Sequence, residues 1–111
     1  MRALIQTQEF IAYYNSLPEK IRGKFDHAMN ILCNIDVPNA KFVKKLVGTD
    51  FYEMRVSVNT NEYRTIIFAI DNDNIVNAKH ILLLNAFLKK STKDYREQIE
   101  IAESILNRFE K

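Results

Sequence analysis

The stretch from Phe51 to Ile70, FYEMRVSVNTNEYRTIIFAI, constrains the fold most, because it has the pattern of a β-hairpin. Its first half alternates with a period of two, as in a half-buried strand. One face carries Tyr52, Met54, Val56 and Val58, and the other carries Phe51, Glu53, Arg55 and Ser57. A polar turn at 59–62 leads into 63–70, whose β-branched and aromatic residues are typical of an inner strand. We expect the first face to point to the core and the second to point outward.

Two arginines, Arg55 and Arg64, interrupt these otherwise apolar strands. A guanidinium beside a buried strand needs an anionic partner such as a carboxylate or a phosphate. The sequence leaves two interpretations open. The arginines could form a structural ion-pair set with Glu53 and Glu62, or they could bind a phosphate group.

The residues before the hairpin have helical spacing. Thr7 is the predicted N-cap of a helix from Gln8 to Leu17, and Pro18 suits the first turn of a second helix. The apolar face of that second helix is Ile21, Phe25, Met29, Leu32 and Ile35. Pro38 ends the helical half, because proline cannot continue the hydrogen-bond ladder.

The remaining segments predict strands and one more helix. We expect strands at Phe42 to Val47 and Ile75 to about Leu88, a short edge strand at Ala3 to Ile5, and a final helix from Asp94 to Glu110 with Thr92 as its cap. The predicted fold is therefore α+β and forms a single domain, residues 1–111. Two N-terminal helices pack on one face of a twisted four-stranded antiparallel sheet, and the C-terminal helix returns to its edge.

The charge of the chain is locally uneven. The net charge is only +2, but the stretch from Lys79 to Arg96 holds one acid, Asp94, among five basic residues. These are Lys79, Lys89, Lys90, Lys93 and Arg96. A basic patch of this kind indicates an anionic partner.

The other composition features exclude several classes of site. A single cysteine, Cys33, excludes an intramolecular disulfide and a multi-cysteine metal site. We find neither a membrane-spanning stretch nor the apolar core of a signal peptide. We therefore expect a cytoplasmic protein with no membrane partner.

Three strings in order, KKLVGTDFYEMRV, EYRTIIFAID and LLLNAFLKKSTKDY, resemble the RelE/ParE superfamily of type II toxins. Within it, the chain is most similar to the phage-derived, HigB-like branch, over roughly residues 8–110. The resemblance implies a ribonuclease toxin that cuts messenger RNA in the ribosomal A site without a metal ion or other cofactor. It also implies a cognate antitoxin, often with a helix-turn-helix domain. The toxin would contact operator DNA only through that antitoxin.

The resemblance also implies roles for particular residues. In this family the substrate's 2′-hydroxyl attacks the adjacent phosphate, and basic side chains move protons and offset charge. The catalytic basic residue falls on Arg55 and the phosphate-binding arginine on Arg64. The basic residue at the end of the last strand falls on Lys89 or Lys90, and the tyrosine of the last helix falls on Tyr95. We also expect three flanking lysines to bind RNA: Lys44, Lys45 and Lys93.

Two other functions remain open. Glu53 stands where ribosome-dependent relatives often carry a lysine, so the chain could be a non-catalytic RNA-binding relative. A ParE-like inhibitor of DNA gyrase would have the same fold and no nuclease chemistry.

Tyr95 could equally be a core residue, since it shares a helix stripe with Ile99. A second apolar line on that helix, at Ile101 and Ile105, could complete the core or receive the antitoxin.

Overall fold

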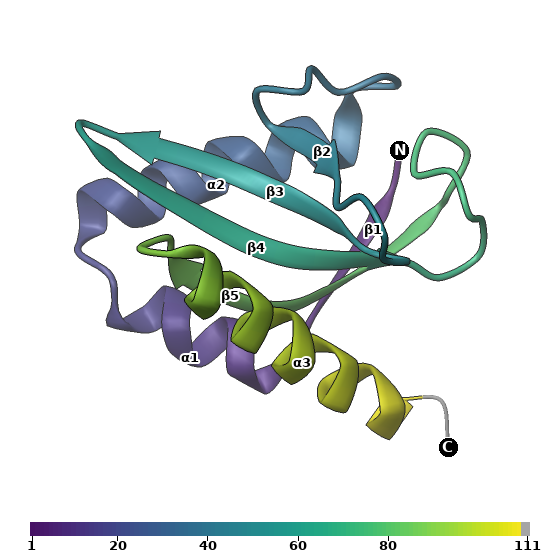
Figure 1. Cartoon of the computed structure of the whole chain (residues 1–111). Coiled ribbons are helices and arrows are strands. Elements are labelled where there is room, and N and C mark those ends of the chain that lie inside the picture. The colour runs from purple at the N-terminus through teal and green to yellow at the C-terminus, as the bar shows by residue number, and fades with distance from the viewer. Residues whose placement is uncertain (110–111) are drawn as a thin grey trace.

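The structure is a computed structural model that describes residues 1–109. Within these residues, three helices pack on the two faces of one five-stranded sheet (Figure 1). The strands are β1 (Ala3–Gln6), β2 (Val43–Lys45), β3 (Tyr52–Val58), β4 (Asn61–Ala69) and β5 (His80–Leu88). The helices are α1 (Gln8–Ser16), α2 (Glu19–Asn34) and α3 (Thr92–Phe109). The α+β class is confirmed, and Glu110, the expected end of the last helix, lies outside the described residues.

The sheet has the order β1-β5-β4-β3-β2. β2 to β5 form the expected antiparallel meander. The expected count of four strands is wrong because β1 adds a fifth, which pairs in parallel with β5. The predicted short strand at the N-terminus therefore lies at an edge of the sheet, as expected.

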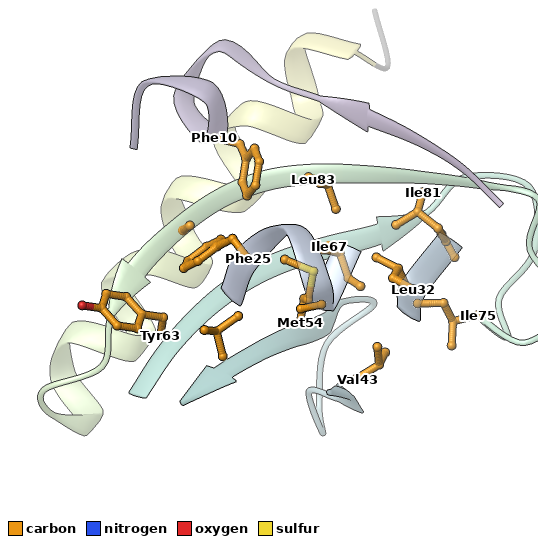
Figure 2. Close-up of a cluster of buried hydrophobic side chains, with 14 of the residues drawn as sticks. Phe10, Phe25, Leu32, Val43, Met54, Tyr63, Ile67, Ile75, Ile81 and Leu83 are labelled. Carbon is orange, nitrogen blue, oxygen red and sulfur yellow. The ribbon is translucent and has the colours of Figure 1, made fainter. Parts of the chain in front are cut away.

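Helices cover both faces of the sheet, with α1 and α2 on one face and α3 on the other (Figure 1). The prediction that the last helix returns to the sheet edge is wrong. β4 and β5 are apolar on both faces, so each face buries its own cluster against a helix. Figure 2 shows the larger cluster, whose members include Phe10, Phe25, Met54 and Ile67.

The smaller cluster joins α3 to the opposite face of the sheet. Its buried members are Phe51, Ile66, Leu82, Leu84, Phe87, Ala102 and Ile105. The face of the hairpin that we expected to point outward is therefore partly buried, and Phe51 and Glu53 are 3% and 5% exposed. Ile105 completes this core, whereas Ile101 remains 43% exposed.

The ends of the helices follow elementary capping chemistry. The Thr7 hydroxyl accepts a hydrogen bond from the Phe10 amide at 3.0 Å, which confirms the predicted cap of α1. At α3 the Ser91 hydroxyl accepts from the Asp94 amide at 3.1 Å, so Ser91 takes the capping role expected of Thr92.

The predicted strand from Ile75 begins five residues too early, because 71–79 is a loop held by side chains. Asp71 accepts hydrogen bonds from the amides of Lys79 and His80 at 3.1 Å. The buried Arg2 donates to the carbonyls of Ile75 and Val76, at 2.9 and 3.3 Å. Arg2 also donates to carbonyls at the C-terminus of α2, namely those of Leu32, Ile35 and Asp36. This one side chain therefore ties the end of α2 to the loop before β5.

Candidate functional site

The two arginines of the hairpin lie directly opposite each other. The register of β3 and β4 sets Arg55 against Arg64, and the register of β4 and β5 sets Phe87 on the other side of Arg64. Cross-strand partners share one face of a sheet. The three side chains therefore form a row across the face that α3 covers.

A buried carboxylate joins the arginines. Glu53 Oε1 lies 3.6 Å from Arg55 Nε, and Glu53 Oε2 lies 3.6 Å from Arg64 Nε. Glu62 Oε1 lies 3.7 Å from Arg64 Nη2. These distances fit ion pairs and exceed those of good hydrogen bonds. The ion-pair interpretation of the sequence is thus found in the structure, and two acids balance the two arginines.

The two arginines differ sharply in exposure. The side chain of Arg64 is 2% exposed, and its Nη1 donates to the Tyr63 carbonyl at 3.0 Å. Burial, followed by the nearby charge of Arg55, lowers the pKa of Arg64, while Glu53 and Glu62 oppose that shift. The side chain of Arg55 is 28% exposed, and its Nη1 donates to the Ala40 carbonyl at 3.2 Å. Arg55 is therefore the guanidinium that an incoming anion can reach, and Arg64 lies behind it.

Tyr95 extends the row of side chains onto α3. Its ring packs edge-on against Phe87, with centroids 5.3 Å apart and planes at 88°. The Lys89 ammonium lies 5.9 Å from the centroid of the Tyr95 ring. The side-chain amide of Asn85 donates to the main-chain carbonyl of Gln98 at 3.1 Å and to its side-chain oxygen Oε1 at 2.9 Å. These bonds hold this part of α3 against β5. Tyr95 is half-buried and so combines a packing role with access to solvent.

Glu62 adds a second carboxylate at the rim of the site. The Ser57 hydroxyl, assisted by the charges of Arg64, Arg55 and Lys89, holds the pKa of Glu62 below its usual value in spite of partial burial. The main-chain amide of Lys89 also donates to the Glu62 carbonyl at 2.8 Å. The site thus contains guanidinium and ammonium donors for a phosphate, together with the two carboxyl groups of Glu53 and Glu62.

The other predicted RNA-binding residues are more scattered. Lys44 pairs with Glu53 in the register of β2 and β3, so it is exposed on the same face as the arginines. Lys45 pairs with Tyr52, and its ammonium lies 5.5 Å from that ring, on the opposite face. Lys90 and Lys93 are exposed between the end of β5 and the first turn of α3. The structure therefore brings together Arg55, Arg64, Lys89, Tyr95 and Lys44, and it separates Lys45 from them.

Sequence reasoning missed three basic residues beside Arg55. Lys24, His27 and Lys41 line a cleft with it, at the edge of β3. Two of them come from α2 and one from the loop before β2. No sequence pattern links those segments, so only the packing of α2 against β3 identifies them.

The described residues show neither a metal site nor a membrane-spanning helix. Within residues 1–109, no group of three or more His, Cys, Asp or Glu side chains is placed to hold a metal ion. No helix in the described part of the chain has the length and apolar character needed to cross a membrane.

Comparison with known proteins gives a family and a fold. The family model described as phage derived protein Gp49-like (DUF891) matches residues 12–107. The chain is similar to E. coli RelE in the intact RelBE toxin-antitoxin complex, with 13% identity and a TM-score of 0.60 over 82% of this chain and 100% of that one. A double arginine-to-alanine variant of free E. coli RelE gives 14% identity and a TM-score of 0.60 over 89% and 95%. The isolated toxin gives 11% identity and a TM-score of 0.54 over 90% and 97%. No curated protein sequence matches significantly.

Proposed function

Because the chain belongs to the phage-derived Gp49-like family, a family of RelE-type toxins, and has the RelE fold, we propose that it is the toxin of a type II toxin–antitoxin system. One matching structure is a toxin–antitoxin complex, which supports a cognate antitoxin as its partner. That antitoxin carries a helix-turn-helix domain and makes the contact with operator DNA.

The proposed activity is cleavage of messenger RNA on the ribosome, in the cytoplasm, without a metal ion. One observation supports it above the others, namely that Arg55 and Arg64 flank Glu53 on one face of the sheet. On the same face Tyr95 packs on Phe87, the cross-strand neighbour of Arg64, and Lys89 lies beside Tyr95. Attack of a 2′-hydroxyl on the neighbouring phosphate needs a proton acceptor, positive charge and a proton donor. Glu53 supplies the acceptor that a pair of arginines cannot supply.

Each residue then has a distinct role. The resemblance gives the phosphate-binding role to Arg64, but because Arg64 is 2% exposed we assign that role to Arg55, whose side chain is 28% exposed. Arg64 adds positive charge from behind it and positions Glu53. Glu53 takes the proton of the 2′-hydroxyl as the new P–O2′ bond replaces the P–O5′ bond. Lys89 or Tyr95 protonates the departing 5′-oxygen. The products are a 2′,3′-cyclic phosphate and a 5′-hydroxyl.

The exposed lysines outside this centre bind flanking phosphates. These are Lys44 on the arginine face, Lys90 just after β5 and Lys93 in the first turn of α3. Lys45 has no role in this arrangement because its side chain lies on the opposite face.

A second candidate is a ParE-like inhibitor of DNA gyrase. The balance of Arg55 and Arg64 by Glu53 and Glu62 favours it, because a protein partner does not need a positive surface. Gyrase inhibition needs no proton transfer at this site. The same balance keeps open a relative that binds RNA without cutting it.

The test is induced expression in a host without the antitoxin. We would compare the wild type with Arg55→Ala and Glu53→Gln, and use Arg108→Ala as a control for loss of a basic residue. Arg108 is 59% exposed and pairs with Glu9, away from the arginine row. Primer extension on a translated and an untranslated copy of one transcript measures cleavage, and plasmid supercoiling measures gyrase activity.

The nuclease proposal expects cuts in the translated copy alone, lost in Arg55→Ala and Glu53→Gln and retained in Arg108→Ala. Intact transcripts with relaxed plasmid would replace it with gyrase inhibition. Intact transcripts with normal supercoiling would leave RNA binding without cleavage.

A further inference from the structure

A cleft of about 200 Å³ lies where α2 crosses the edge of β3. β2 stops pairing with β3 at Val43 and Met54, and only the Arg55 amide makes one further bond, to the Phe42 carbonyl at 2.7 Å. Among residues 1–109, no strand pairs with this edge of β3 beyond that point. The cleft is lined by Lys24, His27, Ala28, Lys41, Phe42, Arg55, Val56 and Ser57.

The lining of this cleft is basic. Lys24, Lys41 and Arg55 supply three positive charges, and the His27 imidazole lies beside them. None of the residues that line it is acidic. Four other hollows on the described surface each contain at least one carboxylate, from Asp50 and Glu103, from Glu9, from Glu19 and Asp26, and from Asp36. This cleft therefore suits an anion better than those four do.

The cleft also offers an aromatic surface. Phe42 is half-buried, and the His27 ring stands edge-on to it, with centroids 5.7 Å apart and planes at 72°. The Lys41 ammonium lies 5.7 Å from the centroid of the same ring. The buried Ala28 and Val56 supply apolar lining. Cations beside an aromatic ring are the combination that binds single-stranded nucleic acid, because bases stack and phosphates pair with charge.

We propose that this cleft binds one nucleotide of a single-stranded RNA, with its phosphate between Lys24 and Lys41 and its base against Phe42. The inference rests on the proposed function, because Arg55 belongs both to the cleft and to the row with Arg64. An RNA strand whose scissile phosphate lies on Arg55 would pass directly from the face of the sheet over the edge of β3. The cleft then holds the adjacent nucleotide and sets which phosphate meets Glu53. An acidic protein segment would account for the lysines but not for the aromatic surface.

The test uses the purified chain and 5′-labelled hexauridylate with 2′-O-methyl groups, which cannot be cleaved through the 2′-oxygen. An abasic hexamer with the same phosphates separates stacking from charge. Fluorescence anisotropy gives the dissociation constants at several salt concentrations. The variants are Phe42→Leu, which keeps an apolar side chain without the ring, and the double variant of Lys24→Gln and Lys41→Gln. Lys20→Gln, an exposed residue one turn earlier on α2, is the control.

We expect Phe42→Leu to weaken hexauridylate binding about tenfold, the loss of one stacked base, and to leave the abasic hexamer unchanged. The double lysine variant weakens both ligands and reduces the slope of log K against log salt by about 1.4. Lys20→Gln binds both ligands as the wild type does. In a spectrum of the ¹⁵N-labelled chain, hexauridylate shifts the amides of Lys41 and Phe42.

Three results would overturn the inference. One is equal affinity of the wild type and Phe42→Leu for hexauridylate. Another is spectral shifts confined to the Lys89 and Tyr95 side of the sheet. The third is loss of affinity for an acidic peptide, but not for RNA, in the double lysine variant. The cleavage assay stands apart from these outcomes, since Arg55→Ala can abolish cleavage whether or not the cleft binds a nucleotide.

Discussion

Replacing Glu53 with glutamine should change three properties of the protein in different directions. The substitution keeps the shape of the side chain and removes the negative charge that lies 3.6 Å from both Arg55 and Arg64. We expect lower stability, tighter RNA binding and loss of cleavage in one variant. The changes in stability and in RNA affinity follow from loss of the negative charge, and the loss of cleavage follows from loss of the proton acceptor.

The stability loss comes mainly from Arg64. A pair of unit charges at 3.6 Å has an interaction of about 4–5 kcal/mol at an effective dielectric constant of about 20. Glu62 remains 3.7 Å from the same guanidinium, and the glutamine oxygen can still accept from it, so only part of that energy is lost. The pair with Arg55, which is 28% exposed, adds at most about 1 kcal/mol. We therefore expect the free energy of unfolding to fall by about 2–3 kcal/mol, measured by urea denaturation.

The gain in RNA affinity follows from the same charge. Removing a negative charge about 6 Å from a phosphate in a water-like dielectric is worth about 0.7 kcal/mol, or about threefold in the dissociation constant. Added salt should reduce the gain, because screening weakens it. Glu62→Gln is the matched control, since it removes a charge from the same arginine at a side chain that is 42% exposed. That control should lose less stability than Glu53→Gln.

Two results would refute this reasoning. Unchanged stability of Glu53→Gln would mean that Arg64 does not depend on its buried carboxylate. Weaker RNA binding by Glu53→Gln would mean that the anion does not bind beside these arginines.

Three further predictions concern single side chains. Arg2→Met removes five hydrogen bonds to backbone carbonyls and should cost about 3 kcal/mol of unfolding free energy in urea, whereas the exposed Arg108→Met should cost under about 1 kcal/mol. Burial is the largest single effect on Asp71 and raises its pKa, but the hydrogen bonds from the His80 and Lys79 amides together outweigh it and lower the pKa from 3.8. The stabilising contribution of Asp71 is therefore present above pH 3.8 and is lost as the pH falls below it. Asp71→Asn should therefore flatten the acid side of a stability–pH curve measured by thermal unfolding. Tyr95→Phe keeps the packing against Phe87, so it should leave the melting temperature unchanged and slow cleavage if the hydroxyl is the proton donor.

The sequence predicted the elements with strong local patterns. The hairpin, the helical stripe of α2 and the cap at Thr7 depend on residues close together in the chain, and each was found. Of the predicted stripe only Ile35 is wrong, because it follows the end of α2 and is 48% exposed. The start of β5 was predicted too early because apolar residues at Ile75 and Ala78 resemble a strand. In the structure they reach the core from a loop that Arg2 and Asp71 hold in place. Arg2 and Ile75 are 73 positions apart in the chain. A contact over that distance leaves no local pattern in the sequence.

The site was predictable as a set of residues but not as an arrangement. Alternation assigned Glu53 and Arg55 to one face, and a strand pattern does not give the register between strands. The register decides that Arg55 stands opposite Arg64. Burial of that face also depends on α3, whose apolar stripe is compatible with either an edge or a face position. The 2% exposure of Arg64 was therefore outside the reach of sequence reasoning.

The distribution of charge around Glu53 indicates how such a site can hold a polyanion. The buried centre pairs one positive group with one negative group, Arg64 with Glu53, and the more exposed Glu62 lies at its rim. The positive groups open to solvent lie around it: Arg55 and Lys44 toward the β3 edge, and Lys89 toward α3. A phosphate chain is then attracted to the rim and not to the centre, so a strand held at both sides of the rim passes over the carboxylate. On the proposed function this arrangement places Glu53 next to the 2′-hydroxyl. A lysine at position 53 would instead place a third positive charge beside two arginines and leave the centre without a proton acceptor.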